Sequence, residues 1–94
     1  MAQARRLLPS MSQLAAFEAV CRTGSTLAAA ADLSLTQGAV SKLIQTLEAQ
    51  LGVPLFLREG RRLVPSEAAA SFARDVARAL DLVSRGVLRV RSTT

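Results

Sequence analysis

Apolar residues recur at the three- and four-residue spacing of helices in the first third of the chain. A stripe of such residues predicts a first helix that Ser10 or Ser12 caps and Gly24 ends. The stripe consists of Leu14, Phe17, Val20 and Cys21. A second, short helix is predicted from Ser25 through the alanines at 28–31, before a break at residues 33–35.

The same spacing predicts a third helix over about residues 36–50. Thr36 is a suitable N-cap, and Gly52 and Pro54 prevent the helix from continuing. Its apolar stripe is Val40, Leu43, Ile44, Leu47 and Leu51. Its opposite face carries small or polar residues, namely Gln37, Gly38, Ser41, Lys42 and Gln45.

Two short apolar stretches between residues 55 and 64 flank Glu59-Gly60, which predicts a β-hairpin. Three arginines surround its tip: Arg58, Arg61 and Arg62. Ser66 then caps a last helix that the pattern extends to about residue 91. Along that helix, apolar residues alternate at spacings of four and three, which is typical of a coiled-coil seam. The seam, which a second copy of the chain is expected to cover, is Ala69, Ala73, Val76, Leu80, Val83, Val87 and Val90.

The second and third helices have the features of a helix-turn-helix. Ala30 is small where the two helices meet, Ser34 lies in a short turn, and Val40 and Leu43 clamp the third helix onto the second. The polar face of the third helix suits base edges and phosphates in a major groove, although a solvated helix face would look the same. The hairpin favours DNA, because arginines on a wing can enter the minor groove. The candidate DNA-contacting residues are Ser25, Thr26, Thr36, Gln37, Gly38, Ser41, Lys42, Gln45, Arg58, Arg61 and Arg62.

Composition supports an anionic partner and argues against catalysis. Lys and Arg number 12 against 7 for Asp and Glu, and eleven of the cations are arginine, which makes forked contacts with phosphates and base edges. Without histidine, and without a nucleophile–base or metal-ligand cluster, we predict no enzyme, metal or cofactor. No apolar run reaches the roughly 20 residues of a membrane span. The lone Cys21 is expected in the core, with a redox sensor as the alternative, and fits a cytoplasmic protein.

Several short motifs follow one another in a fixed order. They are two alanines before the turn, Thr36-Gln37, Ala39-Val40-Ser41, Ile44, Leu47-Glu48, Leu51-Gly52, Leu55-Phe56, Arg58, Arg61 and Ser66-Glu67-Ala68. Together they resemble the amino-terminal domain of LysR-type transcriptional regulators over about residues 11–70. Leu8-Pro9 and residues 14–19 resemble the subgroup of glycine-cleavage activators and β-lactamase regulators. The resemblance implies a mainly α fold, a winged helix-turn-helix of three helices and a two-stranded wing, followed by a long linker helix.

The resemblance also implies an organisation and a function. We expect a flexible arm at residues 1–10, a DNA-binding domain at 11–65 and a linker or dimerisation helix at 66–91. A homodimer would bind double-stranded DNA, with the helix of about 36–50 in the major groove and the wing in the minor groove. Family members typically add a domain that binds a small-molecule inducer. That effector-binding domain has no residues in this sequence, so the chain is expected to be either a fragment or a stand-alone product.

The sequence departs from the family pattern at positions that concern DNA readout. Gly38 stands where many members have a proline that contacts thymine methyl groups, and Lys42 stands where arginine is common. Pro65-Ser66 and Ala69 replace the usual Leu-Thr and Gly before and within the linker helix. Two other functions are weighed against DNA binding: a dimeric protein-interaction module and a membrane-surface helix at 66–91. The seam and the wing argue against the membrane helix.

Overall fold

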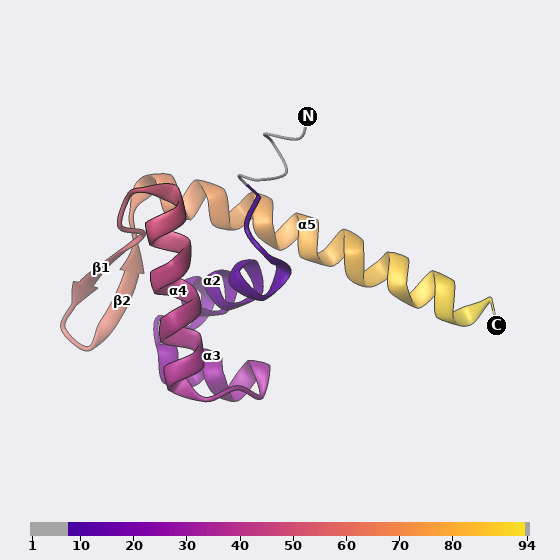
Figure 1. The fold of residues 1–94 in the computed structure, drawn as a ribbon, viewed down its shortest axis with the longest axis horizontal. Helices are drawn as coiled ribbons and strands as arrows, with labels where there is room; N and C mark the ends of the chain where they lie inside the picture. The colour runs from indigo at the N-terminus through magenta and orange to yellow at the C-terminus, as the bar shows by residue number, and fades with distance from the viewer. Residues whose placement is uncertain (1–7, 94) are drawn as a thin grey trace.

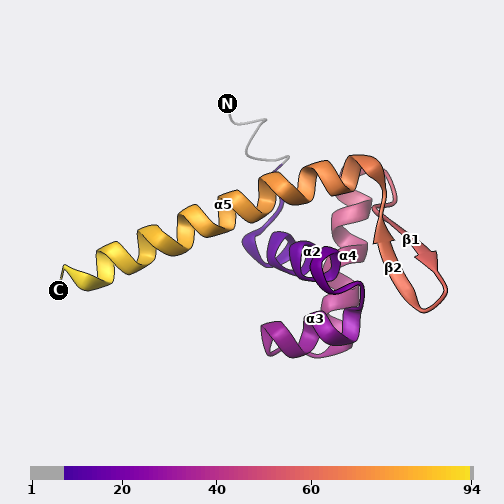
Figure 2. The ribbon, with the colours of Figure 1, turned by 180° about the vertical axis from the view of Figure 1, so that it is seen from behind.

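A computed structural model describes residues 8–93, which form four helices and a two-stranded antiparallel sheet (Figure 1). In chain order the elements are α2 (Met11–Thr23), α3 (Thr26–Leu33), α4 (Gln37–Leu51), β1 (Phe56–Glu59), β2 (Arg62–Pro65) and α5 (Glu67–Ser92). The helices α2, α3 and α4 pack together, the hairpin extends from one side, and α5 runs past α2 and projects away (Figures 1 and 2). The mainly α, winged helix-turn-helix fold with a long final helix is confirmed.

The helix ends follow local capping chemistry. Ser10, not Ser12, caps α2: its hydroxyl accepts a hydrogen bond from the Gln13 N–H at 3.1 Å, and its N–H donates to Gln13 Oε1 at 2.7 Å. The corresponding caps of α3, α4 and α5 are Ser25, Thr36 and Ser66, each at 3.1 Å. Gly24 and Gly52 end α2 and α4 with φ of 75° and 78°, the left-handed conformation that glycine tolerates best.

One aromatic cluster joins the elements. The Phe17 ring of α2 is fully buried, and its centre lies 5.8 Å from the Phe56 ring of β1 and 5.3 Å from the Phe72 ring of α5. Val20, Val40 and Leu47 are the other large side chains that are fully buried. The cluster therefore ties the wing and the start of α5 to the helical core, and apolar burial holds the three parts in one arrangement.

The hairpin turns one residue later than the sequence indicated. Glu59 pairs with Arg62 at the end of the ladder, so the loop consists of Gly60 and Arg61 rather than Glu59-Gly60. Gly60 has φ of 62°, as the first central residue of a two-residue hairpin loop requires. Arg61 therefore lies at the tip, whereas Arg58 and Arg62 lie on the strands.

The predicted seam of α5 is divided. Ala69 and Val76 are buried in the chain's own core, and Ala73 and Leu80 are half-buried against it, since α5 packs on α2 and β2. The expectation that a partner covers the whole seam is wrong for Ala69 and Val76, because their own domain covers them. The rest of the seam, Val83, Val87 and Val90, is exposed.

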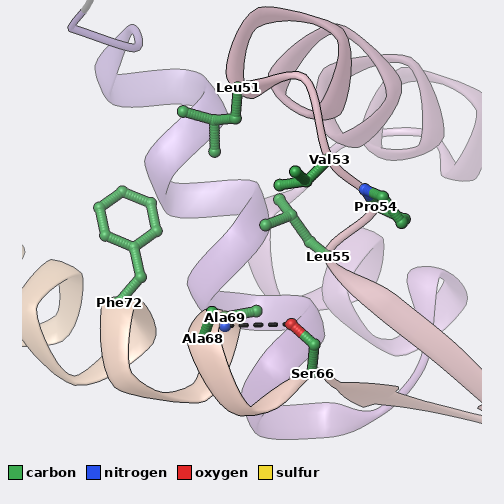
Figure 3. Close-up of a pocket in the computed structure, with 8 residues that line it drawn as sticks. All are labelled: Leu51, Val53, Pro54, Leu55, Ser66, Ala68, Ala69 and Phe72. Carbon is green, nitrogen blue, oxygen red and sulfur yellow. Dashed lines mark hydrogen bonds between the residues drawn. The ribbon is translucent and has the colours of Figure 1, made fainter.

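An apolar hollow of about 430 Å³ lies between the end of α4, the base of the wing and the start of α5 (Figure 3). Its lining is Leu51, Val53, Pro54, Leu55, Ser66, Ala68, Ala69 and Phe72. The Ser66 hydroxyl accepts a hydrogen bond from the Ala69 N–H, which the dashed line in Figure 3 marks. The lining has no titratable side chain, so this hollow has no groups for acid–base or metal chemistry. No helix within residues 8–93 is long and apolar enough to cross a membrane.

Candidate nucleic-acid interface

Candidate DNA-contacting residues from three elements meet in one small polar hollow, which we call the polar notch. It has a volume of about 140 Å³ and lies where the start of α3, the start of α4 and the wing converge. Its lining is Gly24, Ser25, Thr26, Gln37, Arg58, Arg61 and Leu63. Five residues that the sequence singled out for DNA contact are thus neighbours in space, although they span residues 25 to 61.

The start of α3 supplies one side of the polar notch. The Ser25 oxygen accepts a hydrogen bond from the Ala28 N–H, which leaves the hydroxyl proton able to donate outward. The first N–H groups of any helix lack intrahelical partners and carry partial positive charge, so this end favours an anion. The Thr26 hydroxyl accepts from Gln37 Nε2 at 3.0 Å. That bond holds the Gln37 amide of α4 against α3.

The outer face of α4 is open. Gln37, Gly38, Lys42 and Gln45 are exposed and Ser41 is half-buried, while Val40, Ile44 and Leu47 hold the opposite face in the core. A Cβ atom at Gly38 would have no neighbouring heavy atom within 4 Å, so the helix surface is unobstructed there. Thr36 is exposed, and its oxygen accepts the capping bond from Ala39 N–H. Lys42 lies outside the polar notch and lines a separate hollow with Ser12 and Leu35.

The wing arginines are exposed and their charges are not paired. Within residues 8–93, Arg58, Arg61 and Arg62 form no ion pair, whereas Arg78 and Arg85 on α5 each bind an aspartate of the same helix. Unpaired guanidinium groups keep their donors available for phosphates and base edges. The positive charge of the wing is therefore free to act on an anionic partner.

Arg62 has a contact that the sequence did not reveal. Its side chain lies across Gly24, where an added Cβ atom would come within 2.9 Å of Arg62 Cγ and Cζ. Next to it, the Leu63 N–H donates to the Gly24 carbonyl at 2.9 Å and joins β2 to the turn between α2 and α3. Arg62 thus packs on the domain, away from the tip at Arg61. In the sequence, Gly24 could have indicated this contact, because a glycine that ends a helix also lets a neighbouring side chain approach the backbone closely.

Two neighbouring residues of α2, Arg22 and Cys21, have surroundings that give them structural roles. Arg22 bridges Glu18 at 3.1 Å and Asp32 at 2.7 Å, and the hydrogen bonds to these carboxylates raise the pKa of Arg22 further above its usual range. Cys21 is half-buried against the core. Burial, assisted by the Glu18 carboxylate, raises the pKa of the Cys21 thiol to about 11. At neutral pH it is a thiol, not the reactive thiolate that a redox sensor needs.

The comparison with known families decides the identity. The family model described as "Bacterial regulatory helix-turn-helix protein, lysR family" matches residues 11–70. This chain belongs to the lysR family. Regulatory protein NocR of Agrobacterium fabrum is 44% identical over 66 residues, which cover 70% of this chain and 22% of NocR. The chain spans about a fifth of the length of the curated relatives it matches.

Solved structures of the family include DNA complexes. The CbnR DNA-binding domain in complex with DNA is 36% identical with a TM-score of 0.76, over 89% of this chain and 97% of that one. BenM's DNA-binding domain with benA site 1 DNA is 27% identical with a TM-score of 0.80, over 89% and 94% of the two chains. The lysR-family chain described here therefore carries the DNA-binding helix-turn-helix domain of that family.

Proposed function

We propose that this lysR-family chain binds double-stranded DNA in a sequence-specific manner as the DNA-reading unit of a bacterial transcriptional regulator in the cytoplasm. The polar notch carries the proposal. It joins Ser25 and Thr26 at the start of α3, Gln37 of α4 and two wing arginines around a space of about 140 Å³. The Ser25 and Thr26 hydroxyls and the Arg58 guanidinium are donor types that bind phosphate oxygens, so a backbone phosphate seated beside them would set the register of the domain on DNA. Gln37 and Arg61 would then remain available for the two grooves.

We infer that α4 enters the major groove. Its open face presents amide, hydroxyl and ammonium groups that suit base edges, and Gln37, Ser41 and Gln45 are assigned to base contacts. Gly38 has no side chain to contact a thymine methyl, so its role is to let the helix approach closely. Thr36 and Lys42 are assigned to phosphates or bases.

We infer that the wing enters the minor groove with Arg61. The two-residue loop places this side chain at the tip, and it is exposed without an ion pair among residues 8–93. A narrow minor groove has the most negative potential of duplex DNA, and arginine is the side chain most often placed there. Arg58 faces the polar notch and is assigned to a phosphate, and Arg62 is assigned to an outer phosphate beside Gly24.

We infer further that two copies pair through the second half of α5, residues 81–91. This part of the linker helix (residues 66–91) leaves Val83, Val87 and Val90 exposed, with Leu82 and Leu88 nearby. Pairing would cover them and would place two α4 helices on two half-sites of a near-palindrome. The proposed domain of residues 11–65 then reads one half-site. The arm proposed at 1–10 lies mostly outside the described residues.

The test starts from duplexes selected by the chain from random DNA. The logarithm of the affinity is expected to fall linearly with the logarithm of the salt concentration, with a slope of about 0.9 per neutralised phosphate. Gln37→Ala should lose about 1–3 kcal/mol on the selected site and little on random DNA. Arg61→Ala should weaken sites with A/T-rich flanks most. Arg78→Ala is the matched control, because it removes one exposed arginine from α5, away from the polar notch.

Two results would contradict the proposal. Failure to bind any duplex, or affinity that does not respond to salt, would favour the dimeric protein-interaction module. Equal loss on selected and random DNA for Gln37→Ala would make Gln37 a phosphate contact and would move base readout to other residues of α4.

A further inference from the structure

A single carboxylate links the end of α4 to the base of the wing. Glu48 is half-buried near the end of α4, and its Oε2 accepts a hydrogen bond from the Leu55 N–H at 2.7 Å. Leu55 is buried just before β1 and follows Pro54, which has no N–H of its own. The Glu48 carboxylate therefore supplies the partner that a buried N–H requires.

Leu55 is a junction between three elements. Its N–H donates to Glu48 of α4, and its carbonyl accepts from the N–H of Ser66, the N-cap of α5, at 2.9 Å. Its side chain lies on the wall of the apolar hollow opposite Phe72 (Figure 3). The direction in which the chain leaves Leu55 to form β1 is thus set by contacts with α4 on one side and α5 on the other.

The second strand has its own attachment. The Leu63 N–H donates to the Gly24 carbonyl at 2.9 Å, and both groups belong to the backbone. Substitution of a side chain does not delete that bond. On the β1 side, the bond from the Ser66 N–H to the Leu55 carbonyl is likewise between backbone groups, whereas the bond from the Leu55 N–H depends on the Glu48 side chain.

We propose that Glu48 is a positioning residue that sets the angle of the wing relative to α4, and thereby determines discrimination between flanking DNA sequences without touching DNA. This inference rests on the proposed function. The hairpin loop lies about 16 Å along the strand from Leu55 at roughly 3.3 Å per residue. A rotation of about 10° at the base therefore moves Arg61 by about 3 Å, the length of one hydrogen bond.

The first experiment compares Glu48→Ala and Glu48→Gln with the unmodified chain on one core site with A/T-rich or G/C-rich flanks. Glu48→Ala is expected to reduce the preference for A/T-rich flanks about fivefold, the effect of one hydrogen bond. Glu48→Gln is expected to restore it, because the amide oxygen accepts the same bond. Asp75→Ala removes an exposed carboxylate from α5, outside the proposed pairing segment, as the control for charge.

A double-mutant cycle separates wing positioning from general stability. If Glu48 acts through the wing, Glu48→Ala should not change flank preference further once Arg61 is already replaced by alanine. In a Gln37→Ala background, by contrast, Glu48→Ala should reduce flank preference as much as it does in the unmodified chain. Additivity with Arg61→Ala, or an unchanged flank preference, overturns the proposal. Should Glu48→Ala fail to fold, Glu48→Asp keeps the charge, is one methylene shorter, and is expected to give the same loss.

The free protein provides a readout that does not need DNA. NMR relaxation of the amides in residues 56–64 is expected to show a more mobile wing in Glu48→Ala and a normal wing in Glu48→Gln. An unchanged wing in Glu48→Ala overturns the positioning role whatever DNA binding shows. If the unmodified chain binds no duplex, the proposed function fails, and this relaxation measurement alone decides whether Glu48 holds the wing.

Discussion

The two halves of α5 carry one continuous apolar stripe, yet they have different surroundings. In the first half, Ala69 and Val76 are 1% and 3% exposed. In the second half, Val83, Val87 and Val90 are 50%, 49% and 69% exposed. The four- and three-residue spacing is the same in both halves, so the pattern alone does not distinguish them.

The difference comes from where α5 crosses the domain. Its first half packs on α2 and β2, and the small Ala69 and Ala73 allow close approach, while its second half extends beyond the other helices (Figures 1 and 2). Leu80 is half-buried and marks the boundary. A heptad pattern therefore identifies the apolar face of a helix, but what covers that face depends on the positions of the neighbouring elements.

The largest effect that tests this comparison is expected from Val76→Asp. An unpaired carboxylate at a buried site should lower the free energy of unfolding by about 3–5 kcal/mol, a large part of the stability of a domain this small. Urea denaturation followed by circular dichroism measures it. Ala77→Asp, on the exposed side of the same turn, is the control. Equal stability of the two variants would mean that the first half of α5 is not part of the core.

A smaller and different effect is expected from Val87→Asp. The charge falls on an exposed position, so the free energy of unfolding of the domain should stay within about 0.5 kcal/mol of the unmodified value. Pairing of two copies should be lost in sedimentation equilibrium, with weaker binding to a full palindrome and unchanged binding to a half-site. A dimer that persists in Val87→Asp would place the pairing surface elsewhere.

At the boundary, Leu80→Asp is expected to combine both effects. Leu80 belongs to the stripe and is half-buried against the core, so the variant should be less stable than Val87→Asp and also less able to pair. Urea denaturation compares the stability of Leu80→Asp and Val87→Asp, and sedimentation equilibrium compares their ability to pair. Unchanged stability in Leu80→Asp would move the boundary between the two halves toward Val76.

The smallest effect is expected from Gly86→Ala. A Cβ atom at Gly86 would meet Arg89 Nη2 at 3.7 Å, an ordinary contact, and alanine favours helix over glycine by about 1 kcal/mol. The helical signal should rise slightly and pairing should tighten, with no change in core stability. Weaker pairing in Gly86→Ala would indicate instead that the partner helix approaches closest at this glycine.

Prediction from the sequence succeeded where the cause is local. Ser25, Thr36 and Ser66 cap their helices, and Gly24 and Gly52 end theirs, because caps depend on bonds within three or four residues. The hairpin followed from Gly60, although its loop lies one residue later than predicted. The roles assigned to individual DNA-contacting residues, and the subgroup suggested by residues 8–19, remain predictions.

The sequence by itself thus determined the order and ends of the helices, the wing, the apolar faces and the family, since each is encoded in neighbouring residues. Only the tertiary structure decided which part of the α5 stripe the domain covers, that Arg62 lies across Gly24, and that Glu48 binds the Leu55 N–H. It also brought Thr26, Gln37 and the wing arginines into one polar notch. These contacts join segments far apart in the chain, and they form because burial of one shared core sets where each element lies.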